Sequence, residues 1–231
     1  MIGYFDYTVW LTYLSAISAS IGIVASLSGN GHPYIGTLFL LICGLCDAFD
    51  GRVARRKKNR TDSEKNYGIQ IDSLSDLVAF GVLPACIGAA LIFRSTFLRQ
   101  LALAYGNRWF FFIGAFVLFA ILILYALAAM IRLAYFNVTE EERQRIEGGV
   151  RKFYTGLPVT SAALIFPLVL LLQYLTPMDI TLVYVAAALA TGFAFLSRIQ
   201  VPKPRLKGIL VMIAFGLLEV LALVLSYYFS R

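Results

Sequence analysis

The sequence predicts an all-α membrane protein, a polytopic bundle of about seven transmembrane helices. Hydrophobic residues make up 60% of the 231 residues, and the mean hydropathy is +0.78. A soluble domain of this length would not be so apolar. The apolar residues fall into runs long enough to cross a bilayer, separated by short polar segments that are mostly basic. We expect the whole chain, 1–231, to form one domain.

The apolar runs predict the individual spans in chain order. They cover about residues 8–28, 34–53, 69–93, 109–132, 157–174, 179–196 and 208–229. Between them we expect a glycine-rich turn around His32, a polar loop at 56–67, a short loop containing Arg99 and a polar hinge with two prolines at 197–207.

The basic residues predict the orientation. Segments 52–65, 132–152 and 198–207 carry seven, five and four of the twenty Lys and Arg residues. Cytoplasmic loops are enriched in these residues, so we expect the N-terminus and all three segments on the cytoplasmic side of the cell membrane. The net charge of +7 favours anionic membrane lipids as partners rather than nucleic acid.

Four aspartates lie in or at the ends of apolar runs: Asp47, Asp50, Asp72 and Asp76. A charged residue at the centre of a membrane helix costs about 2.5 to 3.5 kcal/mol on insertion scales, so such residues indicate a functional site. At about 100° per residue, Asp47 and Asp50 share one face of a helix. Asp72 and Asp76 are one turn apart on the next helix. Facing helices would therefore bring all four carboxylates into one small volume.

Clustered carboxylates repel one another and need positive charge nearby. Two divalent cations such as Mg²⁺ or Mn²⁺ would roughly neutralise four aspartates and prefer oxygen ligands. Small residues at Gly51, Ala54 and Gly68 would let a bulky ligand approach, and Arg55 could hold a phosphate. The pattern predicts a metal site for a phosphate ester at a membrane surface. Salt bridges between helices are the alternative, although acids outnumber bases here.

These residues resemble the signature of the CDP-alcohol phosphatidyltransferase family, which reads D-x2-D-G-x2-A-R and then G-x3-D-x3-D. Every fixed position is present: Asp47, Asp50, Gly51, Ala54, Arg55, Gly68, Asp72 and Asp76. Twelve residues separate Arg55 from Gly68, which is more than in a common form of the signature. We expect the additional residues to form a longer loop.

The resemblance implies that an alcohol attacks the phosphate of a CDP-linked lipid and releases CMP. It implies that all four aspartates bind metal and that Asp76 is also the general base. It implies contacts with the CDP-linked lipid at Asp50, Gly51, Ala54, Arg55 and Gly68. Related enzymes often carry the pattern P-N-x-x-T in the first span, and Thr12 lies near the position of its threonine. Thr12 is therefore a further candidate for contact with the CDP-linked lipid. An ordinary helix threonine is the alternative at that position.

Residues around the signature resemble the branch of the family that uses serine. In 72–84, Leu77 follows the fourth aspartate, where the glycerol phosphate branch has lysine. The residues R-L-A-Y-F-N at 132–137 and G-L-P at 156–158 also resemble the serine branch, apart from Tyr135. The resemblance therefore implies CDP-diacylglycerol and L-serine as substrates, and a homodimer as the assembly.

Arg132 and Asn137 are the candidate acceptor-binding residues, and a snorkelling arginine and a helix-capping asparagine are their alternatives. Other acceptors (glycerol phosphate or inositol phosphate) and an archaeal ether-lipid donor, CDP-archaeol, remain possible within the family. A divalent-cation transporter is the alternative from another class, and it predicts acids throughout the membrane depth. Apart from the four aspartates, only Glu219 lies at depth in the membrane, where we expect a packing or dimer-contact acid.

Overall fold

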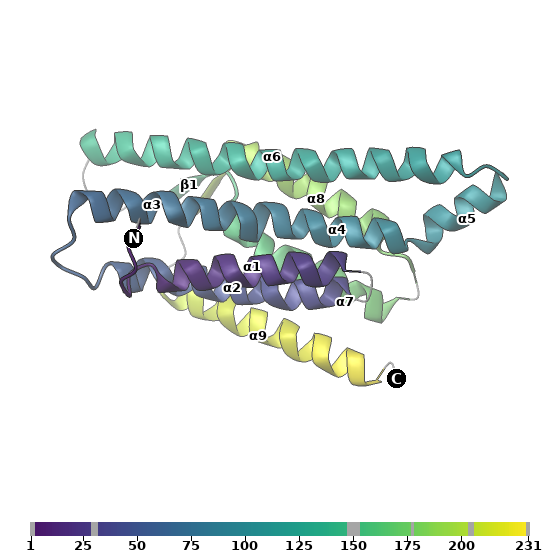
Figure 1. Cartoon of the computed structure of the whole chain (residues 1–231), viewed down its shortest axis with the longest axis horizontal. Helices are drawn as coiled ribbons and strands as arrows, with labels where there is room; N and C mark the ends of the chain where they lie inside the picture. The colour runs from purple at the N-terminus through teal and green to yellow at the C-terminus, as the bar shows by residue number, and fades with distance from the viewer. Residues whose placement is uncertain (1–2, 29–31, 147–152, 177, 203–205, 230–231) are drawn as a thin grey trace.

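The computed structural model describes residues 3–28, 32–146, 153–176, 178–202 and 206–229. Long helices run side by side, and the chain starts near the end of the bundle where β1 lies (Figure 1). The helices are α1 (Trp10–Leu27), α2 (Pro33–Ala54), α3 (Asp62–Asp76), η1 (Leu77–Val82), α4 (Leu83–Arg94), α5 (Thr96–Ala104), α6 (Trp109–Ile146), η2 (Val159–Ser161), α7 (Ala162–Leu175), α8 (Thr181–Leu196) and α9 (Leu206–Phe229). The strands are β1 (Phe153–Thr155) and β2 (Gln200–Pro202).

Each predicted span corresponds to a helix or a continuous helical segment, so the predicted membrane bundle is confirmed. Within the described part of the chain, four segments are long and apolar enough to cross a membrane: Trp10–Leu27, Pro33–Ala54, Asp62–Ala104 and Trp109–Arg143. Val159–Gln173 and Thr181–Leu196 are shorter apolar helices.

Helix α3 begins at Asp62, inside the segment 56–67 that was predicted to be a polar loop. Thr61 and Glu64 form a capping box that starts the helix at Asp62. The Glu64 N–H donates to the Thr61 hydroxyl at 3.2 Å, and the Thr61 N–H donates to the Glu64 carboxylate at 2.8 Å. The loop between α2 and α3 is therefore short, and the remaining polar residues form the first turns of α3.

Three other segments are more ordered than the sequence predicted. α6 continues past residue 132 to Ile146, and the expected loop around Arg99 contains the helix α5. The polar hinge at 197–207 contains β2, which pairs antiparallel with β1, Tyr154 lying opposite Val201. The pairing joins segments far apart in the sequence, which local patterns do not reveal.

Close packing of α1 on α2 fixes the helix that carries the first two aspartates. A Cβ atom on Gly22 would lie 2.9 Å from the Cβ of Phe39, and one on Gly36 would overlap the Ser26 hydroxyl. Small residues of this kind let helix backbones approach inside a membrane, where apolar burial between helices contributes little.

A π-helical turn, η1, lies between α3 and α4 directly after Asp76. Pro84 has no N–H, so the carbonyl of Phe80 four residues earlier loses its helical partner. The hydroxyl of Tyr125 on α6 donates to this carbonyl, and the hydroxyl of Tyr184 on α8 donates to the Pro84 carbonyl at 2.8 Å. The side chains of Phe80, Tyr125 and Tyr184 are fully buried. These two tyrosines connect α6 and α8 to the helix that carries the second pair of aspartates.

Asp179 joins the helices at the opposite end of the bundle. Its carboxylate accepts hydrogen bonds from the Ser95 hydroxyl at 2.7 Å and from the Phe97 and Thr181 N–H groups, each at 2.9 Å. Burial alone would raise the pKa of Asp179, but these hydrogen bonds to the charged form hold it well below its usual value.

We expect Tyr125→Phe to lower the free energy of unfolding by about 1 to 3 kcal/mol, because it leaves the buried Phe80 carbonyl without a partner. Thermal unfolding of the purified protein in detergent measures this loss. Tyr135→Phe is the matched control, since Tyr135 lies on the same helix and is 54% exposed. Equal stability of the two variants would contradict the role of the Tyr125 hydroxyl.

Candidate metal centre and substrate cavity

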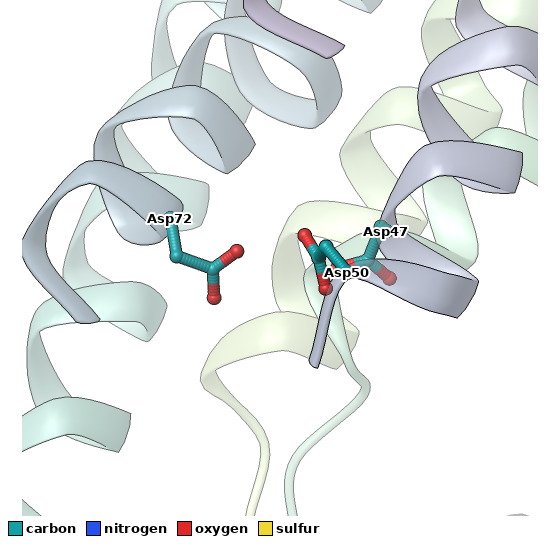
Figure 2. Close-up of side chains that lie close together, drawn as sticks. All are labelled: Asp47, Asp50 and Asp72. Carbon is teal, nitrogen blue, oxygen red and sulfur yellow. The ribbon is translucent and has the colours of Figure 1, made fainter. Parts of the chain in front are cut away.

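Three carboxylates converge between α2 and α3. One oxygen from each of Asp47, Asp50 and Asp72 lies within 4.8 Å of the others. Figure 2 shows Asp72 on one helix with its carboxylate directed toward Asp47 and Asp50 on the facing helix. Across the ranges that the structure describes, no Lys or Arg forms an ion pair with any of the three. The alternative of salt bridges between the helices is therefore wrong for this cluster.

Asp76 lies one turn after Asp72 and does not belong to the group of three. It is 8% exposed and lines the same cavity as the other aspartates. The hydroxyl of the adjacent Ser75 donates to the backbone carbonyl of Thr12 at 3.1 Å, which holds this part of α3 against α1. The predicted group of four is thus present as three converging carboxylates and a fourth beside them.

The donor set of the cluster fits a hard divalent cation. Its ligand atoms are all carboxylate oxygens, which suit Mg²⁺ and Mn²⁺ better than softer metals. Asp50 is only 9% exposed, so water screens the charges incompletely and a cation would reduce their repulsion. The cluster can therefore hold a metal ion.

A cavity of about 800 Å³ opens beside the carboxylates. Its charged lining consists of Asp47, Asp50, Asp72, Asp76, Arg52, Arg55 and Arg132 among the described residues, and Thr160 and Ser161 add two hydroxyls. Its apolar part includes Leu38, Leu41, Leu45, Leu164, Leu217 and Val220 from α2, α7 and α9. A ligand with a charged head and a hydrocarbon tail matches this division.

Three other residues predicted for the site line the cavity: Gly51, Arg55 and Arg132. A Cβ atom on Gly51 would lie 3.2 Å from a terminal nitrogen of Arg55, so the guanidinium covers the glycine. Arg132 is 5% exposed and donates from Nε to the Leu157 carbonyl at 3.3 Å. Its burial in the wall of the cavity argues against a snorkelling side chain.

Four predicted residues do not line the cavity: Thr12, Ala54, Gly68 and Asn137. The side-chain amide of Asn137 donates to the Ser73 hydroxyl at 2.8 Å, which ties α6 to α3 beside Asp72. Gly68 is covered by Arg60, whose Nη2 would lie 2.6 Å from a Cβ atom at that position. Asn137 is thus hydrogen-bonded to the residue after Asp72, and Gly68 lies one turn before Asp72, but neither residue lines the cavity.

Sequence reasoning missed the cavity wall formed by η2, the start of α7, β2 and α9, which includes Thr160, Val201 and Gly216. Gly156, with φ of 80°, turns the chain into this wall. Its N–H donates to the Ile199 carbonyl at 2.7 Å. The G-L-P pattern at 156–158 was the one local indication that this segment matters.

The N-terminal segment is tied to the loop that follows the first two aspartates. The Lys57 ammonium lies 2.6 Å from the Asp6 carboxylate and 2.7 Å from the Glu64 carboxylate. The hydrogen bond from Lys57 lowers the pKa of Asp6 to about 2. These contacts tie the loop between α2 and α3 to the N-terminal segment and to the first turn of α3.

A model of the CDP-alcohol phosphatidyltransferase family matches residues 8–228. The chain belongs to this family. The match covers nearly all of the described helices, and the family signature coincides with the carboxylates that the fold brings together.

Several curated relatives are similar to this chain over about two thirds of its length. CDP-diacylglycerol–serine O-phosphatidyltransferase of Saccharomyces cerevisiae is 34% identical over 163 residues, 68% of this chain and 50% of the relative. The protein of the same name from Helicobacter pylori strain 26695 is 28% identical, over 69% of this chain and 56% of its own length. Archaetidylserine synthase of Methanothermobacter thermautotrophicus is 33% identical, over 66% and 52%. The matches thus span about half the length of these relatives.

We expect Mn²⁺ to raise the melting temperature of the purified protein, because binding to the folded state alone stabilises it. Asp72→Asn should remove most of this shift. Asp62→Asn on the same helix is the matched control, because its side chain is 93% exposed and lies outside the cluster. An Mn²⁺ shift of equal size in all three proteins would contradict a metal site at the carboxylates.

Proposed function

We propose that the chain transfers the phosphatidyl group of CDP-diacylglycerol to the hydroxyl of L-serine, giving phosphatidylserine and CMP. The observation that carries this proposal is the cavity, in which a family carboxylate signature meets an apolar wall. Relatives that are named for serine as the acceptor support the choice of acceptor.

The division of the cavity suits a nucleotide-linked lipid as donor. Two of the aspartates and Arg55 lie at the C-terminal end of α2, and the cavity-lining leucines of α2 come before them on the same helix. Arg55 is suited to bind the diphosphate, because a guanidinium donates two parallel hydrogen bonds to phosphate oxygens. The donor would keep its hydrocarbon chains in the membrane while its diphosphate lies at the carboxylates.

In the proposed reaction the serine hydroxyl oxygen attacks the phosphorus that carries diacylglycerol. The bond from this phosphorus to the bridging oxygen breaks, and its electron pair leaves with CMP. Asp76 accepts the hydroxyl proton as the general base. Asp47, Asp50 and Asp72 would hold the cations, with Asp76 as a further ligand. When bound, two divalent cations of the Mg²⁺ or Mn²⁺ type supply charge stabilisation to the transferred phosphoryl group and the leaving group.

Arg132 is our candidate for binding the serine carboxylate. It lines the same cavity as the aspartates and comes from α6. Asn137 supports the site indirectly through its hydrogen bond to Ser73, one residue after Asp72. This assigns the acceptor side of the site to α6 and the donor side to α2 and α3.

A second candidate is the same reaction with an ether-lipid donor, CDP-archaeol. It is favoured by the 33% identity to archaetidylserine synthase, which is close to the highest identity quoted above. A transporter is not favoured, since the aspartates converge at one site and Glu219, 2% exposed, packs inside the bundle apart from them. Membrane lipids are the surroundings in either case, and the homodimer stays a prediction.

We expect CMP release from the purified protein with CDP-diacylglycerol, Mn²⁺ and L-serine, and none when glycerol 3-phosphate or inositol phosphate replaces serine. Asp76→Asn should lower the rate about 10²- to 10⁴-fold, because the general base is lost. Asp62→Asn should retain the wild-type rate. Release with another acceptor alone would contradict serine, and release with CDP-archaeol alone would select the ether-lipid donor.

The orientation is part of the proposal: the N-terminus and the carboxylate site face the cytoplasm. A cysteine at exposed Ser63, in Ser63→Cys, should react with a membrane-impermeant maleimide in inverted membrane vesicles and not in intact cells. Gln100→Cys, in exposed α5 at the opposite end of the bundle, should show the reverse. Labelling of Ser63→Cys from outside intact cells would contradict the orientation.

A further inference from the structure

Two arginines from the loop between α2 and α3 cover the two glycines that flank the carboxylates. Arg55 covers Gly51, which follows Asp50, and Arg60 covers Gly68, one turn before Asp72. The contact of Arg60 is the closer of the two, with Nη2 2.6 Å from the position of a Cβ atom on Gly68. Any side chain at position 68 would displace the guanidinium.

The Arg60 guanidinium uses few of its five N–H donors. Nη2 donates to the backbone carbonyl of Glu64 at 3.1 Å. Nε is shielded from solvent and has no hydrogen-bond partner among the residues that the structure describes. A buried donor without a partner is unfavourable, so this arrangement would improve if an acceptor reached the guanidinium.

The neighbouring cation Lys57 is engaged differently. It forms ion pairs with Asp6 and Glu64, whereas Arg60 forms none with any carboxylate in the described ranges. The capping box at Thr61 and Glu64 fixes the residue that follows Arg60, so the side chain starts from a defined position above Gly68. Arg60 is therefore a positioned cation without an acidic partner in the described part of the chain, and it lies over the glycine one turn before Asp72.

We propose that Arg60 is a second binding residue for the diphosphate of the nucleotide-linked donor, acting from the α3 side as Arg55 acts from the α2 side. The inference rests on the proposed function. When the donor binds, the Arg60 guanidinium moves off Gly68 and donates to phosphate oxygens, which gives its Nε an acceptor. The glycine then leaves room for the nucleotide where the guanidinium lay. Arg60 lies within the long spacer of this chain, outside the fixed positions of the signature.

Calorimetric titration of the purified full chain with CDP in the presence of Mn²⁺ tests this directly. Arg60→Ala should raise the Kd for CDP about tenfold or more, the loss expected for a charge-assisted hydrogen bond. Arg60→Lys should fall between Arg60→Ala and the wild type, because it keeps the charge and loses the planar pair of donors. Arg56→Ala is the matched control, since Arg56 is an exposed arginine in the same loop.

Turnover adds a second measurement. Arg60→Ala should raise the KM for CDP-diacylglycerol and leave the KM for the acceptor unchanged. If Arg60→Ala does not fold, as its melting temperature would reveal, Arg60→Gln and Arg60→Lys replace it in both measurements. If the wild-type chain binds CDP, and Arg60→Ala and Arg56→Ala weaken this binding equally or not at all, the role of Arg60 is overturned. The proposed function would not be affected by that result. Failure of the wild-type chain to bind CDP at all would overturn the proposed function together with the role of Arg60.

Discussion

The repulsion among Asp47, Asp50 and Asp72 is the constraint on which the rest of the structure depends. Two charges within 4.8 Å repel by about 3.5 kcal/mol at an effective dielectric constant of about 20, and the cluster contains three such pairs if all are ionised. No arginine or lysine of the described residues offsets this by an ion pair. Packing must therefore hold α2 and α3 together, and the cluster gains stability from whatever positive charge binds there.

The packing that opposes this repulsion comes from helices without carboxylates in the site. α1 lies tightly on α2 through Gly22 and Gly36, and its Thr12 carbonyl accepts the hydroxyl of Ser75 beside Asp76. α6 and α8 hold the other end of the same helical segment through the hydroxyls of two buried tyrosines. The Tyr125 hydroxyl satisfies the Phe80 carbonyl that Pro84 leaves without its α-helical partner, so the helical segment continues through Pro84. Hydrogen bonds to other helices thus hold the segment on both sides of Asp76.

The sequence predicted the parts of this structure that are governed by local pattern. Hydropathy located the seven spans, and spacing placed Asp47, Asp50 and Asp72 on facing helices. The start of α3 was missed, although Thr61 and Glu64 are spaced as a capping box, because a run of polar residues between two spans suggests a loop. The pairing of β1 with β2 could not be predicted, since neither strand has a partner nearby in the sequence. Arg60 was not singled out, because its contact with Gly68 appears only once α3 has formed.

The carboxylates of the site and the wall of its cavity come from different parts of the sequence. The four carboxylates and Arg55 come from 47–76 and belong to a short signature that identifies them, whereas Arg60 lies in the spacer between its two halves. The cavity wall opposite them comes from the start of α7, from β2 and from α9, which the chain reaches only after a hundred further residues or so. The turn at Gly156 and the pairing of β1 with β2 bring those segments to the cavity. Neither feature determines which side chains line it. A short sequence pattern can therefore reveal the carboxylates, whereas the residues of the wall are found only once the fold is known.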